Sequence, residues 1–138
     1  MSDTEQVRTR KVRILLADDH PQVRRQLESR LRREPDFEVV GVATNTTQTW
    51  QAAQAKQPDL LLIDPMMRDG LGLATLRQVC VNLPNLIVVV LTAFIDTTLN
   101  IQLRRMGIKH ILAKGVLFSQ LLSELRAATS TSTHSLDG

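Results

Sequence analysis

The chain has little of several residue types that help to decide a protein's class. Its 138 residues include one cysteine, Cys80, no tyrosine, one tryptophan and three phenylalanines. A single cysteine excludes an intrachain disulfide, so we expect a reduced, buried thiol and a cytoplasmic location. The scarcity of aromatic rings argues against a surface that stacks nucleic-acid bases. No apolar run reaches the roughly 18 residues that span a bilayer, and no signal-peptide core follows Met1, so we expect no membrane partner.

What the chain does contain is typical of one globular domain. Hydrophobic residues make up 43% and charged residues 22%, which is ordinary for a folded domain of this length. The net charge of +3 would suit nucleic acid, but nine of the 17 basic residues fall before Glu34. Several of them have an ion-pair partner one helical turn away, as Arg32 has in Glu28. We therefore interpret the positive charge as a solvated face.

Short apolar runs alternate with stretches of helical periodicity along the chain. Pro21 suits the first turn of a helix, and Val23, Leu27 and Leu31 then recur every four residues. The apolar runs are rich in strand-forming residues and cover 12–17, 37–43, 60–63, 86–91 and 108–113. Strands apolar on both faces that alternate with helices indicate a parallel sheet covered on both sides. We predict an α/β, flavodoxin-like (βα)5 fold, a doubly wound five-stranded parallel sheet of order 2-1-3-4-5.

The ends of the chain differ from its centre in composition. Residues 1–11 are polar and charged and form a predicted N-terminal extension. Residues 12–128 hold all the predicted strands and helices. Residues 129–138 are small and polar, cannot build a core, and are expected to be a flexible tail or the start of a linker. The sequence thus predicts one domain between two short extensions.

Polar side chains follow each of the five predicted strands. Asp18 and Asp19 follow the first strand, Asp64 the third, Thr92 the fourth and Lys114 the fifth. Because the carboxyl ends of parallel strands meet at one edge of the sheet, we expect these side chains to converge. The second strand lies at the side of the predicted sheet, so its polar residues should fall outside this group.

This combination of side chains suits phosphoryl chemistry. Adjacent carboxylates repel one another, and Mg²⁺, which prefers oxygen ligands and keeps several waters, relieves that repulsion. An aspartate can attack phosphorus and form an acyl phosphate. Lys114 would then neutralise charge on the phosphoryl group, and the Thr92 hydroxyl would donate a hydrogen bond to it. Singly, an aspartate such as Asp19 before Pro21 is equally well explained as a helix cap, so the specificity lies in the combination.

Four segments together resemble the receiver domains of bacterial two-component response regulators, the CheY-like domains. They are ILLADDHPQV at 14–23, DLLLID at 59–64, VLTA at 90–93 and GIKHILAKG at 107–115. The Asp-Asp-His-Pro start and the segment FEVVGV at 37–42 are most similar to the NarL-type branch. The resemblance extends from about residue 12 to residue 128.

The resemblance implies a role for each residue of the predicted site. Asp64 would accept phosphate from a sensor histidine kinase or a phosphotransfer protein. Asp18 and Asp19 would bind Mg²⁺ together with Asp64, and the backbone carbonyl of Met66 would be a further ligand. Thr92 would be the switch hydroxyl and Lys114 the phosphate partner. Phosphorylation would change the surface formed by the fourth helix, the fifth strand and the fifth helix, which a partner or a second copy would read.

Three positions depart from the family pattern. Arg68 stands where the family usually has a proline that stiffens the loop after the acceptor. Pro65 removes the backbone N–H that commonly helps to hold the phosphate. Ile111 replaces a tyrosine or phenylalanine whose ring usually turns inward when the threonine moves. These departures keep open a second hypothesis, a degenerate receiver used for phosphorylation-independent docking or dimerisation.

We predict that the chain is not an enzyme. A dinucleotide or nucleotide site would need a glycine-rich turn after the first strand, where this chain has Asp-Asp-His-Pro. A phosphatase of the haloacid-dehalogenase type would need a spaced pair of aspartates there. We also expect DNA binding only through an output domain absent from this chain, because nothing after Leu125 has the apolar content of a helix-turn-helix.

Overall fold

The protein is described by a computed structural model that covers residues 10–93 and 96–137, with side chains described through Ser130. Its main feature is a five-stranded parallel sheet of order β2-β1-β3-β6-β7. Numbered by appearance in this sheet, that is the predicted order 2-1-3-4-5. The strands are β1 (Val12–Ala17), β2 (Phe37–Ala43), β3 (Leu60–Ile63), β6 (Ile87–Thr92) and β7 (His110–Ala113). The last two begin one or two residues later than the sequence predicted.

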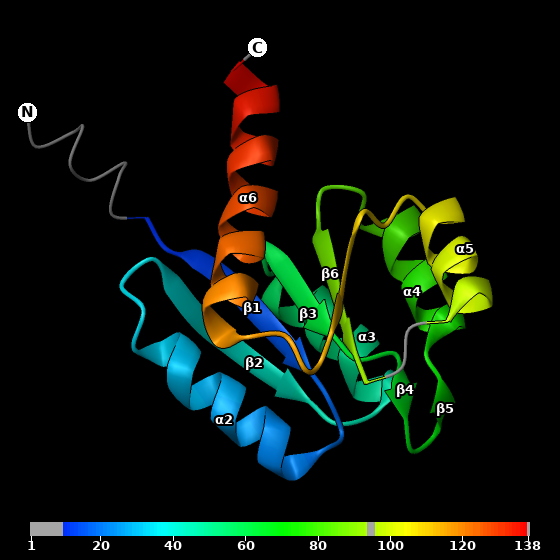
Figure 1. Ribbon diagram of the computed structural model, residues 1–138. Coiled ribbons are helices and arrows are strands. Elements are labelled where there is room, and N and C mark those ends of the chain that lie inside the picture. Colours follow the sequence, from blue (N-terminus) through cyan, green and yellow to red (C-terminus); the bar gives the residue numbers. More distant parts are fainter. Residues whose placement is uncertain (1–9, 94–95, 138) are drawn as a thin grey trace, which may run out of the picture.

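Helices cover both faces of the sheet (Figure 1). Within the described residues they are α2 (Pro21–Arg32), α3 (Thr46–Lys56), α4 (Leu73–Asn82), α5 (Thr97–Arg105) and α6 (Phe118–Asp137). Helices α2 and α6 share one apolar cluster with the sheet, and α3, α4 and α5 share the other. The result is the three-layer, doubly wound α/β fold that the alternation of strands and helices predicts.

Strand β3 shows how the sequence produces this layering. Successive side chains of a strand point to opposite faces. Leu61 and Ile63 join the cluster with α3, α4 and α5, whereas Leu60 and Leu62 join the cluster with α2 and α6. All four side chains are almost completely buried, and burial of each contributes about 2 kcal/mol to the hydrophobic stabilisation. A polar residue at any of these four positions would be buried in an apolar layer and would destabilise the fold unless it found a hydrogen-bond partner.

The residues after β2 serve the next helix, as their edge position predicts. The Asn45 side chain accepts a hydrogen bond from the Gln48 amide and caps α3. Thr44 donates to the Gln48 side chain through both its amide and its hydroxyl. The polar groups at this strand end are therefore used locally, outside the predicted site.

The segment 66–72, which lies between the third predicted strand and the next helix, contains regular structure that no apolar run predicts. Strand β4 (Met66–Met67) pairs with β5 (Gly70–Leu71) in a small antiparallel hairpin. Gly70 has φ +123°, which favours glycine at this turn. The Asp69 carboxylate accepts hydrogen bonds from the amide and hydroxyl of Thr46. This contact joins the hairpin to the start of α3.

Helix α6 extends through Asp137, where the sequence predicts a flexible tail from residue 129. Ala127 and Ala128 are strong helix formers, and the Thr129 hydroxyl bonds back to the Leu125 carbonyl at 3.0 Å. The helix therefore continues beyond the residues whose apolar periodicity predicts it. The domain boundary at 128 stays a prediction, and residues 1–9 of the predicted extension lie outside the described residues.

Two smaller findings complete the fold. Cys80 is half-buried rather than fully buried, and burial raises the pKa of its thiol. None of the described helices combines the length and the apolar composition that a bilayer-spanning helix requires.

Candidate functional site

The predicted site residues meet at the carboxyl edge of the sheet because backbone hydrogen bonds place their strand ends side by side. Ile63 of β3 pairs with Ala17 of β1, and the Asp64 amide donates to the Ala17 carbonyl at 2.9 Å. On the other side, the Lys114 amide donates to the Thr92 carbonyl at 2.8 Å. The parallel register thus carries the two aspartate-bearing strands and the lysine-bearing strand to one place.

Lys114 joins two buried carboxylates. Its Nζ lies 2.9 Å from Asp18 Oδ2 and 2.7 Å from Asp64 Oδ2. The two aspartate side chains are 2% exposed and the lysine side chain 11%. Burial by itself would lower the pKa of Lys114, but the hydrogen bonds to Asp64 and Asp18 and their charges outweigh it and raise that pKa. The lysine is therefore a firmly protonated counter-ion for a buried pair of carboxylates.

His20 also faces this group, although the residue pattern predicts no role for it in the site. Its Nδ1 lies 3.1 Å from Asp18 Oδ1, 3.2 Å from Asp19 Oδ1 and 2.9 Å from Lys114 Nζ. His20 occupies the N-cap position of α2, but its side chain makes no capping hydrogen bond among the described residues. The signal that could have found it is an imidazole directly after two site aspartates.

The segment after Asp64 fixes the orientation of its carboxylate. The Met66 amide donates to Asp64 Oδ1 at 2.9 Å, while Asp64 Oδ2 pairs with Lys114. Pro65, between them, is buried and has no N–H to offer. The Met66 amide is thus the backbone donor that this segment directs at the acceptor, and a ligand role for the Met66 carbonyl stays a prediction.

The other predicted residues lie around this centre. Thr92, the last residue of β6, is fully buried. Arg68 is exposed in the turn between β4 and β5. Ile111 is half-buried and packs against the apolar cluster that contains Leu99 and Leu103 of α5. A small aliphatic residue therefore fills the position at which the family usually has an aromatic ring.

The donor set suits a hard divalent cation. Asp18, Asp19 and His20 each offer one ligand atom, and these atoms lie within 4.8 Å of one another. The Asp64 carboxylate is joined to this group through Lys114 Nζ, which contacts both Asp18 and Asp64. Three carboxylates at one strand edge are what Mg²⁺ needs when it keeps several waters.

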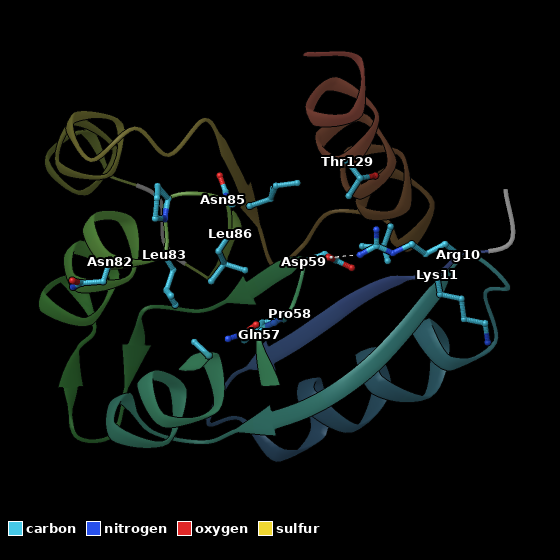
Figure 2. Close-up of a pocket in the computed structure, with 14 residues that line it drawn as sticks. Arg10, Lys11, Gln57, Pro58, Asp59, Asn82, Leu83, Asn85, Leu86 and Thr129 are labelled. Carbon is cyan, nitrogen blue, oxygen red and sulfur yellow. Dashed lines mark hydrogen bonds and ion pairs between the residues drawn. The ribbon is translucent and has the colours of Figure 1, made fainter. Parts of the chain in front are cut away.

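A large cavity lies at the opposite, amino edge of the sheet (Figure 2). It has a volume of about 980 Å³ and lies between the start of β1, the α3–β3 turn, the α4–β6 loop and α6. Arg10 and Asp59, which form an ion pair of 3.4 Å, line it together with Thr129 of α6. The predicted site residues do not line this cavity, so the cavity and the acidic site are separate features at opposite edges of the sheet.

A (βα)5 sheet with buried aspartates and a lysine at its carboxyl edge defines the class of signal receiver domains. The family model of the response regulator receiver domain matches residues 14–126, and the chain belongs to this family. The predicted membership, made on the motifs around Asp18, Asp64, Thr92 and Lys114, is confirmed.

The relatives point to the branch of NarL and LuxR-type regulators. The transcriptional regulatory protein LiaR of Bacillus subtilis is 32% identical over 118 residues, which cover 86% of this chain and 56% of LiaR. The response regulator protein VraR of Staphylococcus saprophyticus is 36% identical over 85 residues, covering 62% of this chain and 41% of VraR. The chain therefore spans about half the length of the curated relatives it matches.

Solved structures show the same fold at low sequence identity. The signal receiver domain of NarL from Mycobacterium tuberculosis superposes with a TM-score of 0.78 at 22% identity, covering 90% of this chain and 98% of that one. A CheY-like receiver domain protein from Methanospirillum hungatei gives a TM-score of 0.84 at 19% identity, covering 91% and 98%. The CheY-like, flavodoxin-like fold is confirmed.

Proposed function

We propose that this domain is a phosphoacceptor switch of cytoplasmic two-component signalling and that Asp64 is the acceptor. The observation that carries the proposal is the buried arrangement of Asp64, Asp18 and Lys114 at the carboxyl edge. Both aspartate side chains are only 2% exposed, and buried charges are stable only when they are paired. A family member that had lost phosphoryl transfer would have no need to keep these two buried carboxylates.

The transfer step needs an oriented nucleophile. An Asp64 oxygen attacks the phosphorus of the donor, a phosphohistidine of a sensor kinase or phosphotransfer protein. The new oxygen–phosphorus bond forms as the phosphorus–nitrogen bond breaks, and the electron pair leaves with the imidazole. The Met66 amide, 2.9 Å from Asp64 Oδ1, holds the carboxylate in one orientation for this attack.

The surrounding residues bind the ion and the phosphoryl group. Asp18, Asp19 and the backbone carbonyl of Met66 would hold Mg²⁺ together with Asp64. When bound, Mg²⁺ supplies positive charge that stabilises the phosphoryl oxygens. Lys114, already 2.7 Å from Asp64 Oδ2, needs only a small movement to reach a phosphoryl oxygen. Thr92 would supply a hydroxyl hydrogen bond to the same group.

The signal leaves through the surface of α5, β7 and α6, which are the fourth helix, the fifth strand and the fifth helix of the prediction. Phosphorylation stabilises a minor conformer of this surface. Ile111 packs on the α5 side of the sheet. Its side chain is smaller than an aromatic ring, so its movement would change this surface less. A partner or a second copy in a homodimer reads the change. In a longer protein, DNA would be contacted by a separate output domain.

Intact-mass measurement after incubation with acetyl phosphate tests the proposal. We expect a gain of one phosphoryl group that requires both Mg²⁺ and Asp64, so that Asp64→Asn abolishes it. Asp59→Asn, at the amino edge, is the matched control and should keep the gain. A folded wild-type protein that takes up no phosphoryl group would contradict the proposal, and this is the result expected of a phosphorylation-independent docking module.

A further inference from the structure

The imidazole of His20 is turned into the acidic site, where it contacts Asp18 and Asp19. The His20 amide donates to Asp18 Oδ1 at 2.8 Å, which closes a tight turn directly before Pro21 and α2. This turn fixes the backbone of His20 next to Asp18 of the site. The side chain is 55% exposed and still places Nδ1 within 3.2 Å of both Asp18 and Asp19.

The neighbours of His20 Nδ1 favour two incompatible states of this atom, one with a hydrogen and one with a lone pair. A neutral imidazole nitrogen carries either a hydrogen or a lone pair. The carboxylates of Asp18 and Asp19, 3.1 and 3.2 Å away, favour a hydrogen on Nδ1. The Lys114 ammonium, 2.9 Å away, can only donate and therefore favours a lone pair. A cation in contact with the Nδ1 lone pair and both carboxylate oxygens resolves this conflict for all three acceptors.

The spacing of these acceptors fits one six-coordinate ion. Neighbouring ligands of an octahedral ion with bonds of roughly 2.1 Å lie about 3.0 Å apart, and opposite ligands about 4.2 Å apart. The separations of His20 Nδ1 from Asp18 Oδ1 and Asp19 Oδ1 are 3.1 and 3.2 Å. The separation of His20 Nδ1 from Asp64 Oδ2 is 3.9 Å. The first two distances match neighbouring ligands, and the third is close to that of opposite ligands.

We propose that His20 Nδ1 is a direct ligand of the divalent cation of this site and makes the site selective for transition-metal dications over Mg²⁺. The inference rests on the metal-binding part of the proposed function. Mg²⁺ strongly prefers oxygen ligands, whereas imidazole nitrogen suits first-row transition metals. Replacing one oxygen ligand by His20 therefore weakens Mg²⁺ relative to an ion such as Mn²⁺.

Mn²⁺ is the probe for the test, because it accepts both oxygen and nitrogen ligands and is paramagnetic. Pulsed electron paramagnetic resonance of Mn²⁺ bound to the wild-type protein should show coupling to one imidazole nitrogen. His20→Gln should remove the coupling, and the ratio of Mn²⁺ to Mg²⁺ affinity, measured by calorimetric titration, should fall about tenfold. His110→Gln is the matched control, because His110 pairs with Glu124 far from the site, and it should change neither result.

The outcomes separate this inference from the proposed function. Mn²⁺ that is bound at the site, as shown by its loss in Asp19→Asn, but without nitrogen coupling would overturn the inference. An unchanged affinity ratio in folded His20→Gln would do the same. Failure of the folded wild-type protein to bind either ion would also overturn it. Nitrogen-coupled Mn²⁺ in a protein that takes up no phosphoryl group would support the inference while contradicting the phosphoacceptor proposal.

Discussion

The two edges of the central sheet both carry opposite charges, but they hold them in different surroundings. At the carboxyl edge, Lys114 contacts Asp18 and Asp64, and all three side chains are at most 11% exposed. At the amino edge, Arg10 pairs with Asp59 at 3.4 Å, and their side chains are 76% and 33% exposed. An exposed pair is screened by water and contributes little, whereas buried charges are costly to leave unpaired. Buried charge thus marks the edge at which the chemistry is expected.

Because the charges at the carboxyl edge are buried, we expect the largest effect on stability from the loss of the Lys114 charge. Lys114→Met leaves the carboxylates of Asp18 and Asp64 buried beside each other without their counter-ion. We expect the free energy of unfolding, measured with urea in the presence of a chelator, to fall by about 3 kcal/mol. Mg²⁺ should restore part of this loss, because it brings positive charge to the same carboxylates.

The exposed Lys109 provides the control for this prediction. Lys109→Met should change the free energy of unfolding little, and equal effects of the two substitutions would contradict the comparison. The pH dependence gives a second check. Because the folded-state pKa of Lys114 is raised above 10.5, its contribution is present below pH 10.5 and is lost as pH rises through the folded value. Lys114→Met should lack this alkaline loss.

A proline lies at each edge of the sheet, and substituting each of them tests the same contrast between the edges with a smaller expected effect. Pro65, after the acceptor, and Pro58, before β3, are both buried. Pro65→Ala restores a backbone N–H beside the phosphoryl group, and one hydrogen bond to a charged group should raise phosphoryl occupancy about tenfold. Intact mass at a fixed acetyl phosphate concentration measures the occupancy. Pro58→Ala should leave the phosphoryl occupancy unchanged. An unchanged occupancy in Pro65→Ala would show that the missing N–H does not limit phosphorylation.

The smallest effect is expected from an exposed ion pair at the amino edge. Arg126 contacts Asp36 at 2.8 Å, and their side chains are 46% and 43% exposed. The hydrogen bond from Arg126 lowers the pKa of Asp36 below its ordinary 3.8. The stabilisation is therefore present above pH 3.8 and is lost as pH falls through the lower, folded value.

Arg126→Met keeps an unbranched side chain but removes the guanidinium that pairs with Asp36 and lies 5.4 Å from the centre of the Phe37 ring. We expect a loss of about 0.5 kcal/mol in the free energy of unfolding at neutral pH, after allowance for solvent screening. The loss should shrink in acid, below the folded pKa of Asp36, because the ion pair is then absent in both proteins. Urea titrations at neutral and acidic pH measure both values, and a loss that stayed constant with pH would show that the Asp36 charge does not contribute to it.

The fold could be predicted from the sequence because strands such as 60–63 are apolar on both faces, which only a covered parallel sheet explains. The convergence of Asp18, Asp64 and Lys114 followed from the strand order alone. The hairpin at 66–71 could not be predicted, because its two short strands depend on the turn at Gly70 and on the distant contact between Asp69 and Thr46.

Two other features show the same limit of local patterns. The extension of α6 past residue 129 could not be predicted, because small polar residues continue a helix without leaving an apolar period. His20 was missed because the direction of its side chain depends on the turn closed by Asp18. Such features are set by contacts that a residue pattern does not encode.

The proposed function depends on phosphorylation of the buried carboxylate of Asp64. Borohydride reduction of the protein after incubation with acetyl phosphate and Mg²⁺ would convert an aspartyl phosphate to homoserine, which peptide mass spectrometry locates. We expect homoserine at position 64, with Asp18, Asp19 and Asp59 unchanged. Homoserine at another aspartate, or none in a folded protein, would contradict it.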